Sequence, residues 1–177
     1  MDDTLFAPVN KLIQDHRILK GHLQAVVNAA DAMRNGRLDD TNAAALQQAL
    51  GFFHTEVPRH ARIEDELLLP RMKKLLKDPS SHFAYLLEHI AKDHHEFAAM
   101  HAELAGLSEA LAVRMRFNPP PADQPNPMLD RFCELAVLLQ DYYRSHILVE
   151  ERDIFPAVPH ALTESDLREL AAEVEKA

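Results

Sequence analysis

Histidine and glutamate occur four residues apart at two places in the chain. His60 and Glu64 form one pair and His146 and Glu150 the other, and both motifs continue with an acidic residue and, five residues later, a proline. On a helix, residues four apart lie on one face about one turn from each other, so each pair can hold one ion from two sides. Imidazole nitrogen with carboxylate oxygen suits iron, manganese or zinc. The spacing predicts a metal site built from two copies of one motif.

A second repeated feature lies upstream of each motif. An acidic residue directly precedes His16 and also His89, and we align these two pairs as equivalent. His16 and His89 are therefore the predicted third and fourth imidazole ligands. Glu64 and Glu150 are the predicted bridging ligands, because a carboxylate joins two ions in a way that a lone imidazole normally does not. Two copies of a helical hairpin, each with an acid–His pair and a His-x-x-x-Glu pair, suit a centre with two metal ions.

Residues one helical turn from the predicted ligands give further candidates. Asp93 is a candidate to ligate the metal or to orient His89, and Glu56 is a candidate hydrogen-bond acceptor beside a ligand. Tyr85 and Tyr142 are candidates to hydrogen-bond an oxygen species on the metal, with core packing as the alternative role.

The other seven histidines are expected on solvated faces or near helix ends. They are His22, His54, His82, His94, His95, His101 and His160. A half-turn shift of the third helix would bring His94 or His95 inward instead.

The elements that must position these residues are helices. Ala, Leu, Glu, Gln and Arg dominate the sequence, which has only four glycines and no run of alternating β-branched residues. Helix caps and apolar periodicity predict four long helices and a short fifth one, over about 8–34, 40–77, 80–116, 128–155 and 163–176. Pro58 inside the second helix predicts a kink.

Proline marks the connection between the third and fourth helices. Five of the eleven prolines fall within residues 118–127, which predicts an extended loop. The other connections are short, so the predicted fold is an all-α, up-down-up-down antiparallel four-helix bundle with a short C-terminal helix. A length of 177 residues suits one domain over 1–177, with its core at about 5–158.

Charge and composition exclude several classes of function. Acidic residues outnumber basic ones by 28 to 19, and no basic block offers nucleic acid a binding surface. No uninterrupted apolar run reaches the roughly 18 residues of a membrane span. The start of the chain lacks the charged and apolar regions of a secretory signal, and a lone cysteine fits a reducing compartment, so a cytoplasmic location is expected. Zincin, phosphate-loop and nucleophile-elbow motifs are missing.

The metal-site residues resemble those of the hemerythrin-like family, also called HHE cation-binding domains, over about residues 5–158. The resemblance rests on His16, His60-x-x-x-Glu64, His89 and His146-x-x-x-Glu150. It implies a four-helix bundle with a non-haem di-iron centre, bridged by both glutamates, with the four histidines as terminal ligands and zinc or manganese as substitutes. Such centres interact with dioxygen, nitric oxide or peroxide, or they sense or donate iron.

Two departures separate this sequence from the oxygen-carrying hemerythrins. Asp93 stands where those have the second histidine of His-x-x-x-His, and His146-x-x-x-Glu150 replaces their His-x-x-x-x-Asp. Fewer imidazoles disfavour reversible oxygen carriage and favour the branch linked to iron homeostasis, oxidative or nitrosative stress, or peroxide breakdown.

The leading hypothesis is therefore a di-iron protein that binds a small diatomic ligand or peroxide, with turnover as an oxidoreductase left open. A second hypothesis is a non-enzymatic sensor or iron-handling module that acts through a protein partner. A third is a helical interaction protein whose histidines hold adventitious zinc.

Overall fold

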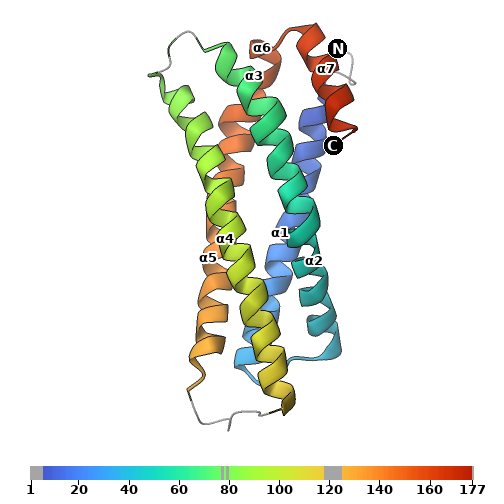
Figure 1. Ribbon diagram of the computed structural model, residues 1–177, viewed down its shortest axis with the longest axis vertical. Coiled ribbons are helices and arrows are strands. Elements are labelled where there is room, and N and C mark those ends of the chain that lie inside the picture. The colour runs from blue at the N-terminus through green and yellow to red at the C-terminus, as the bar shows by residue number, and fades with distance from the viewer. Residues whose placement is uncertain (1–5, 77, 79, 118–124, 177) are drawn as a thin grey trace.

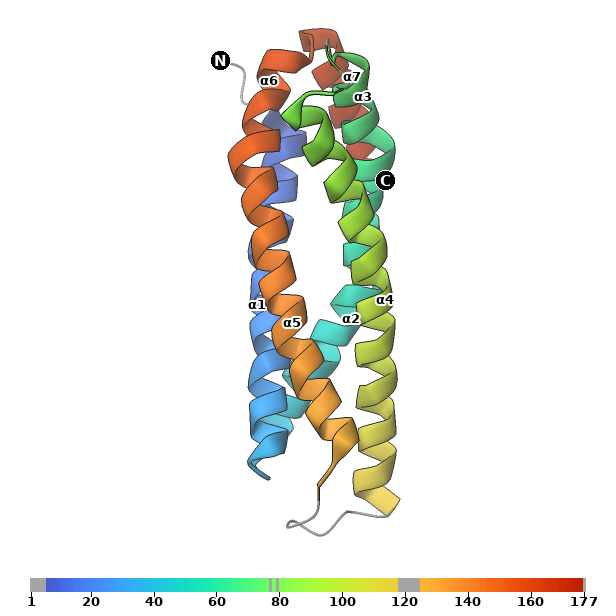
Figure 2. The same cartoon turned by 90° about the vertical axis from the view of Figure 1, so that its left-hand side faces the viewer.

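The fold is known from a computed structural model that describes residues 6–76, 78, 80–117 and 125–176. The described residues form helices and turns and contain no strand. Four long helical segments run lengthwise, and each is antiparallel to the segment that precedes it in the sequence (Figures 1 and 2). The predicted all-α antiparallel four-helix bundle is confirmed.

The long segments are not all continuous α-helices. The first is α1 (Ala7–Arg34) and the third is α4 (His82–Phe117). The second consists of α2 (Asp40–Arg62), a π-helical turn (Ile63–Leu68) and α3 (Leu69–Lys74). The fourth consists of α5 (Pro127–Val149), a π-helical turn (Glu150–Ile154), a 3-10 turn (Phe155–Ala157) and α6 (Val158–Ala161). The short C-terminal helix is α7 (Glu164–Val174).

Local capping explains where these helices begin. The Asp39 side chain accepts from the backbone N–H of Asn42 at the start of α2, and Asn126 caps α5 in the same way. Thr163 and Asp166 form the predicted capping box of α7. The proline-rich loop was predicted over 118–127, but residues 118–124 lie outside the described residues and α5 already begins at Pro127.

The two π-helical turns occupy equivalent positions in the two His-x-x-x-Glu motifs. The N–H of Leu69 bonds to the carbonyl of Glu64, and the N–H of Phe155 bonds to that of Glu150. A proline follows each of these bonds, and its ring and missing N–H disfavour the regular α-helical pattern there. Wide turns of this kind often accompany functional sites.

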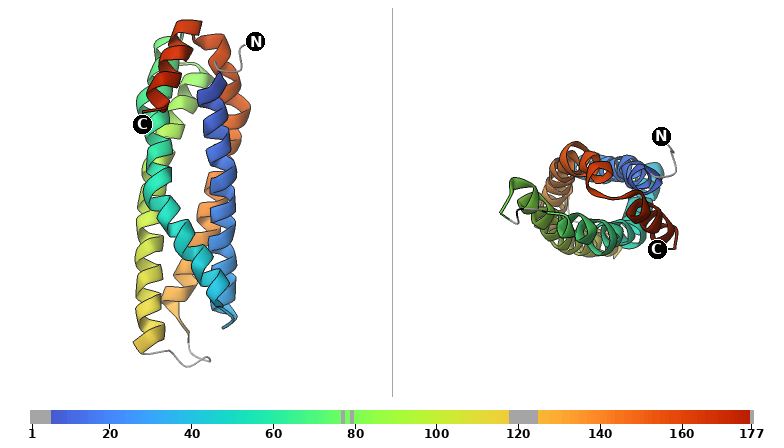
Figure 3. Two further views of the ribbon diagram at one scale, coloured as in Figure 1. Left: turned by 90° about the vertical axis from the view of Figure 1, so that its right-hand side faces the viewer. Right: turned by 90° about the horizontal axis from the view of Figure 1, so that it is seen from above.

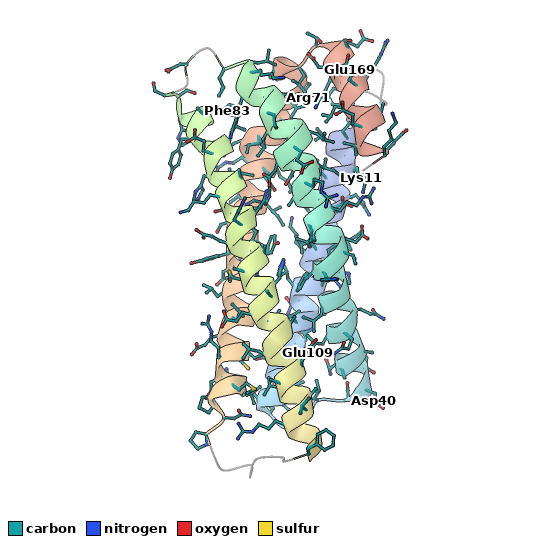
Figure 4. All side chains as sticks on the ribbon, viewed as in Figure 1. Lys11, Asp40, Arg71, Phe83, Glu109 and Glu169 are labelled. Atoms are coloured by element: carbon teal, nitrogen blue, oxygen red, sulfur yellow. The ribbon has the colours of Figure 1, made fainter. Side chains whose placement is uncertain are left out.

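The apolar core is divided into two clusters, one toward each end of the bundle. The cluster toward the C-terminal end of α1, the lower cluster, includes Leu19 of α1 and Phe97 of α4. The cluster toward the N-terminal end of α1, the upper cluster, includes Leu12 of α1 and Ile90 of α4. Helix α7 adds its apolar face to the upper cluster, and Nη2 of Arg71 in α3 holds α7 by donating to both carboxylate oxygens of Glu173. Figure 4 shows Arg71 at that same end of the molecule.

Helix α2 continues through Pro58 and changes direction along its length (Figure 3), in line with the kink predicted at that proline. Within the described part of the chain, no helix has the length and apolarity needed to cross a membrane.

Candidate metal centre

Four histidines and two glutamates meet in the interior, between the two apolar clusters. All four long segments contribute to this group: His16 from α1, His60 from α2, Glu64 from the following π-helical turn, His94 from α4, His146 from α5, and Glu150 from the last π-helical turn. Their side chains are between 1 and 11% exposed. The wide turns place both glutamates on the inner face of the bundle.

Each imidazole directs its Nε2 atom at a carboxylate. The two oxygens of Glu64 lie 3.4 Å from Nε2 of His60 and 3.2 Å from Nε2 of His94. Those of Glu150 lie 3.1 Å from Nε2 of His16 and 3.0 Å from Nε2 of His146. Each glutamate therefore faces one histidine with each oxygen, which is how a bridging carboxylate is arranged.

The ligand atoms form two overlapping groups. One comprises His16, His60, Glu64 and Glu150, and the other comprises Glu64, His94, His146 and Glu150. Within each group, one potential ligand atom from every residue lies within 4.8 Å of the others. Two ions held in this way would each have two imidazoles of their own and would share both carboxylates.

A second carboxylate faces the Nδ1 atom of every one of these imidazoles. The four pairs are His16–Glu151 at 3.0 Å, His94–Asp65 at 3.0 Å, His146–Asp93 at 3.1 Å and His60–Asp15 at 3.5 Å. A carboxylate that accepts from Nδ1–H fixes the ring orientation and the tautomer, and it leaves the Nε2 lone pair directed at the centre. Such pairs commonly support histidines that ligate metals.

Ion pairs dominate the electrostatics of the centre. Burial by itself lowers the pKa of His60, His94 and His146, but the surrounding carboxylates raise the pKa of His60 and His94 to about 10 and that of His146 to about 9. Burial likewise raises the pKa of Glu64, yet the positive charges of His60 and His94 beside it hold that pKa well below its usual value. Without metal, protons therefore supply the positive charge that the carboxylates require.

Several buried atoms of the centre lack a well-formed hydrogen bond. Both carboxylate oxygens of Glu64 and of Glu150 are in this position, as is Nε2 of His94, among the described residues. The Nε2 atoms of His16 and His60 also face each other at 3.2 Å. Enclosed polar groups without good partners are costly, and a cation at this place would satisfy them. The nitrogen and oxygen donors fit iron, manganese or zinc.

A sequence comparison supports the geometry. The model of the hemerythrin HHE cation-binding domain matches residues 7–158, which is most of the chain. The chain belongs to the hemerythrin family. The match begins with α1, ends at the first residue of α6 and leaves α7 beyond its end. No curated protein sequence matches the chain.

The structure of this hemerythrin domain brings five of the six predicted ligands together. They are His16, His60, Glu64, His146 and Glu150. The prediction for His89 was wrong, because its side chain is 47% exposed and its nearest charged partner is Asp93, at 3.8 Å. His94 takes its place, although it was expected on a solvated face.

Two signals in the sequence point to His94. Both His16 and His94 directly follow an aspartate, whereas His89 follows a glutamate. His94 also continues the buried apolar stripe of α4, four residues after Ile90 and three before Phe97, as His16 stands between Leu12 and Leu19 on α1. The apolar register therefore identifies the ligand better than the acid–His pair alone.

The predictions for residues around the ligands have mixed outcomes. Asp93 accepts a hydrogen bond from His146 and does not orient His89. Glu56 is half-exposed and pairs with Arg59, so it does not support the centre.

The tyrosine predictions were wrong. Tyr85 and Tyr142 are 60% and 45% exposed, and each points away from the interior. The tyrosine that packs beside the centre is Tyr143, whose ring lies edge-on to His146. Neighbouring residues on a helix point about 100° apart, so the predicted stripe missed it by one position.

Four of the remaining histidines are exposed as expected, namely His54, His82, His95 and His160, whereas His22 is partly buried and His101 is buried. It is 9% exposed and stacks on Phe53, where burial lowers its pKa to about 4. His101 is therefore a neutral interior side chain.

Proposed function

We propose that this hemerythrin domain holds two iron ions between its four long segments and binds dioxygen, nitric oxide or peroxide at them. The observation that carries the proposal is the pair of four-residue ligand groups that share Glu64 and Glu150. Family membership supports cation binding as the function. The roles in stress responses or in iron homeostasis expected from the sequence remain part of this proposal.

The chain itself has three tasks in this function. His16 and His60 would hold one ion, His94 and His146 the other, and the two glutamates would bridge them. Bound iron would supply redox chemistry and open coordination positions for a small ligand. Each ion has only two imidazoles and two shared carboxylates from the protein, which leaves room for that ligand.

The residues around the ligands tune and shield the centre. The four outer carboxylates orient the imidazoles and raise their basicity. The apolar clusters above and below limit access of water, because Leu12, Leu19, Ile90 and Phe97 are almost fully buried on either side of the ligands.

Metal analysis after anaerobic reconstitution with ferrous ion tests the proposal. We expect about two irons per chain, and we expect Glu64→Ala and Glu150→Ala each to abolish the paired centre. Glu66→Ala is the matched control, because Glu66 lies two residues from Glu64 on the exposed side of the helix. A chain that takes up no iron, or a Glu64→Ala protein with full iron content, would refute the assignment.

The ligand is tested separately by mixing the ferrous protein with dioxygen, nitric oxide or peroxide and recording absorption spectra. A stable, reversible dioxygen adduct indicates a carrier, and sustained consumption of peroxide indicates an enzyme. Iron binding without any spectral response to these ligands would overturn the small-ligand part and favour iron handling through a protein partner.

A further inference from the structure

A cavity of about 480 Å³ lies between α2 and α4, directly beside the candidate metal centre. Its walls are mainly apolar, with Phe53 and Val57 from α2 and Phe97 from α4. It reaches the surface between the helices, because the exposed Ala98 and Ala102 line it. At its inner end it is lined by ligand histidines of the centre. The volume falls in the range of pockets that bind small organic molecules.

Apart from atoms of the metal-ligand candidates His60 and His94, two buried polar atoms in the cavity wall have no hydrogen-bond partner among the described residues. They are Nε2 of His101 and the hydroxyl of Tyr143. Leaving a buried donor or acceptor unpaired is unfavourable, and native proteins rarely do so without a water or a ligand to satisfy it. Both atoms belong to residues that line the same cavity, so one bound molecule can reach both.

The two halves of the bundle differ at these residues. The ligands of the first half of the bundle have equivalents in the second half. From α1 to α4 the offset is 78 residues, as for His16 and His94, and from α2 to α5 it is 86 residues, as for His60 and His146. At the same offsets, His101 corresponds to the buried Leu23, and Tyr143 corresponds to the buried Val57. Only the second half therefore carries the polar pair in place of apolar core residues.

The surface residues at the cavity mouth also differ between the two halves of the bundle. On the opposite face, Gln140 of α5 donates a hydrogen bond of 3.2 Å to Gln24 of α1, which joins the two helices at the surface. The corresponding residues between α2 and α4 are His54 and Ala102, which line the cavity mouth. One face of the repeated fold thus carries a glutamine pair that joins its helices, whereas the other carries His54 and Ala102 at the cavity mouth, beside the polar pair.

The walls define the chemistry of the molecule that fits. Aromatic rings form a column along the wall. The ring centroids of Phe53 and His101 are 4.6 Å apart with an interplanar angle of 8°, and those of His101 and Tyr143 are 5.6 Å apart with an angle of 12°. A flat aromatic ring extends such a column. His101 is neutral, so the polar pair offers no positive charge to an anion. Among the described residues, the lining includes the carboxylates of Asp15, Asp65 and Glu66, and its only Lys or Arg, Arg62, is exposed.

We propose that the cavity between α2 and α4 binds a small neutral phenol, with its ring against the aromatic column and its hydroxyl group at His101 and Tyr143. The phenol hydroxyl donates to the imidazole and accepts from Tyr143, or the reverse, which satisfies both atoms. This inference goes beyond metal binding, because the cavity and its polar pair do not depend on a bound ion. It adds an organic ligand beside the centre.

Calorimetric titration with 4-ethylphenol tests the proposal, on the iron-loaded protein and on the metal-free protein. We expect saturable binding of one molecule per chain in both forms, and weaker binding of ethylbenzene, which lacks the hydroxyl. Tyr143→Phe removes only the tyrosine hydroxyl, and we expect it to weaken 4-ethylphenol about fivefold, as the loss of one net hydrogen bond does. The same variant should leave ethylbenzene binding unchanged. If the tyrosine hydroxyl only maintained the shape of the cavity, its removal would weaken both ligands alike.

A second variant closes the cavity from the surface and leaves the core intact. His54→Gln with Ala102→Gln reproduces the glutamine pair of the opposite face, and we expect at least a tenfold loss of 4-ethylphenol binding. Gln24→Ala is the matched control and should bind as the wild type does. Helix content and iron content are measured for each variant.

The proposal is overturned if neither form of the wild-type protein binds 4-ethylphenol saturably, or if the closed variant binds it as tightly as the wild type. These outcomes are independent of the proposed function. Iron uptake without phenol binding rejects only the cavity proposal, and phenol binding without iron uptake rejects only the di-iron proposal.

Discussion

Replacing His94 by alanine separates the observed centre from the one predicted by sequence alone. His94 and His146 are the two imidazoles of the second ligand group, whereas the first group uses neither. His94→Ala therefore leaves the second ion one imidazole and leaves the first group complete. We expect iron content to fall from about two ions per chain to about one. His89→Ala is the matched comparison and should keep two, because His89 is 47% exposed and outside both groups.

The same pair of variants should differ in stability without metal. His94 lies 3.2 Å from Glu64, which is 1% exposed, and 3.0 Å from Asp65. Removing one partner of a buried ion pair costs about 3–5 kcal/mol, and His60 still faces the other oxygen of Glu64, so we expect the lower end of that range. His89→Ala should change the free energy of unfolding by no more than about 0.5 kcal/mol, as is usual for a surface substitution.

The assays are iron quantitation after anaerobic reconstitution, and urea unfolding of the metal-free proteins followed by circular dichroism. Two ions in His94→Ala together with one ion in His89→Ala would refute the observed register of α4. Equal unfolding free energies for the two variants would refute the buried ion pair of His94 with Glu64.

Asp93→Asn should weaken iron binding about 10- to 100-fold in a chelator competition, because Asp93 orients His146. The exposed control Glu56→Gln should keep the wild-type affinity for iron. Equal iron affinities of the two variants would contradict the role of Asp93. In the metal-free protein, the pKa of His60 is raised to about 10 from 6.5. The contribution of protonated His60 to the free energy of unfolding is therefore complete below about pH 6.5 and is lost as the pH rises toward 10. A urea midpoint that stays constant from pH 6.5 to 10 would contradict this. Phe132→Ala should cost about 3–5 kcal/mol in urea unfolding, because Phe132 is 0% exposed in the lower apolar cluster, and a cost below 1 kcal/mol would show that the site collapses around the cavity.

Much of the fold follows from local sequence. Apolar spacing and caps such as Asp39 and Thr163 placed helix ends within a few residues of those observed, because these signals act within one turn of the chain. The π-helical turns that begin near Glu64 and Glu150 were not predicted. A one-residue widening of a turn leaves almost no trace in apolar periodicity, and only the prolines that follow hint at it.

The ligand on α4 shows where sequence reasoning stopped. His89 and His94 are five residues apart, so they point about 140° apart around a helix. Both follow an acidic residue, and that local feature does not decide between them. The choice depends on how α4 is rotated about its axis, which is fixed by burial of Ile90 and Phe97 against the other helices.

The sequence by itself determined the two His-x-x-x-Glu pairs, because four-residue spacing on a helix needs no other segment. Only the tertiary structure decided which carboxylates support the imidazoles. Glu151 reaches His16 across 135 residues of sequence, and Asp65 reaches His94 across 29. It also decided that a cavity lies between α2 and α4, beside the ligands. These features depend on side chains from different helices, whose relative rotation and spacing are set by packing of the whole core and cannot be derived from any one segment.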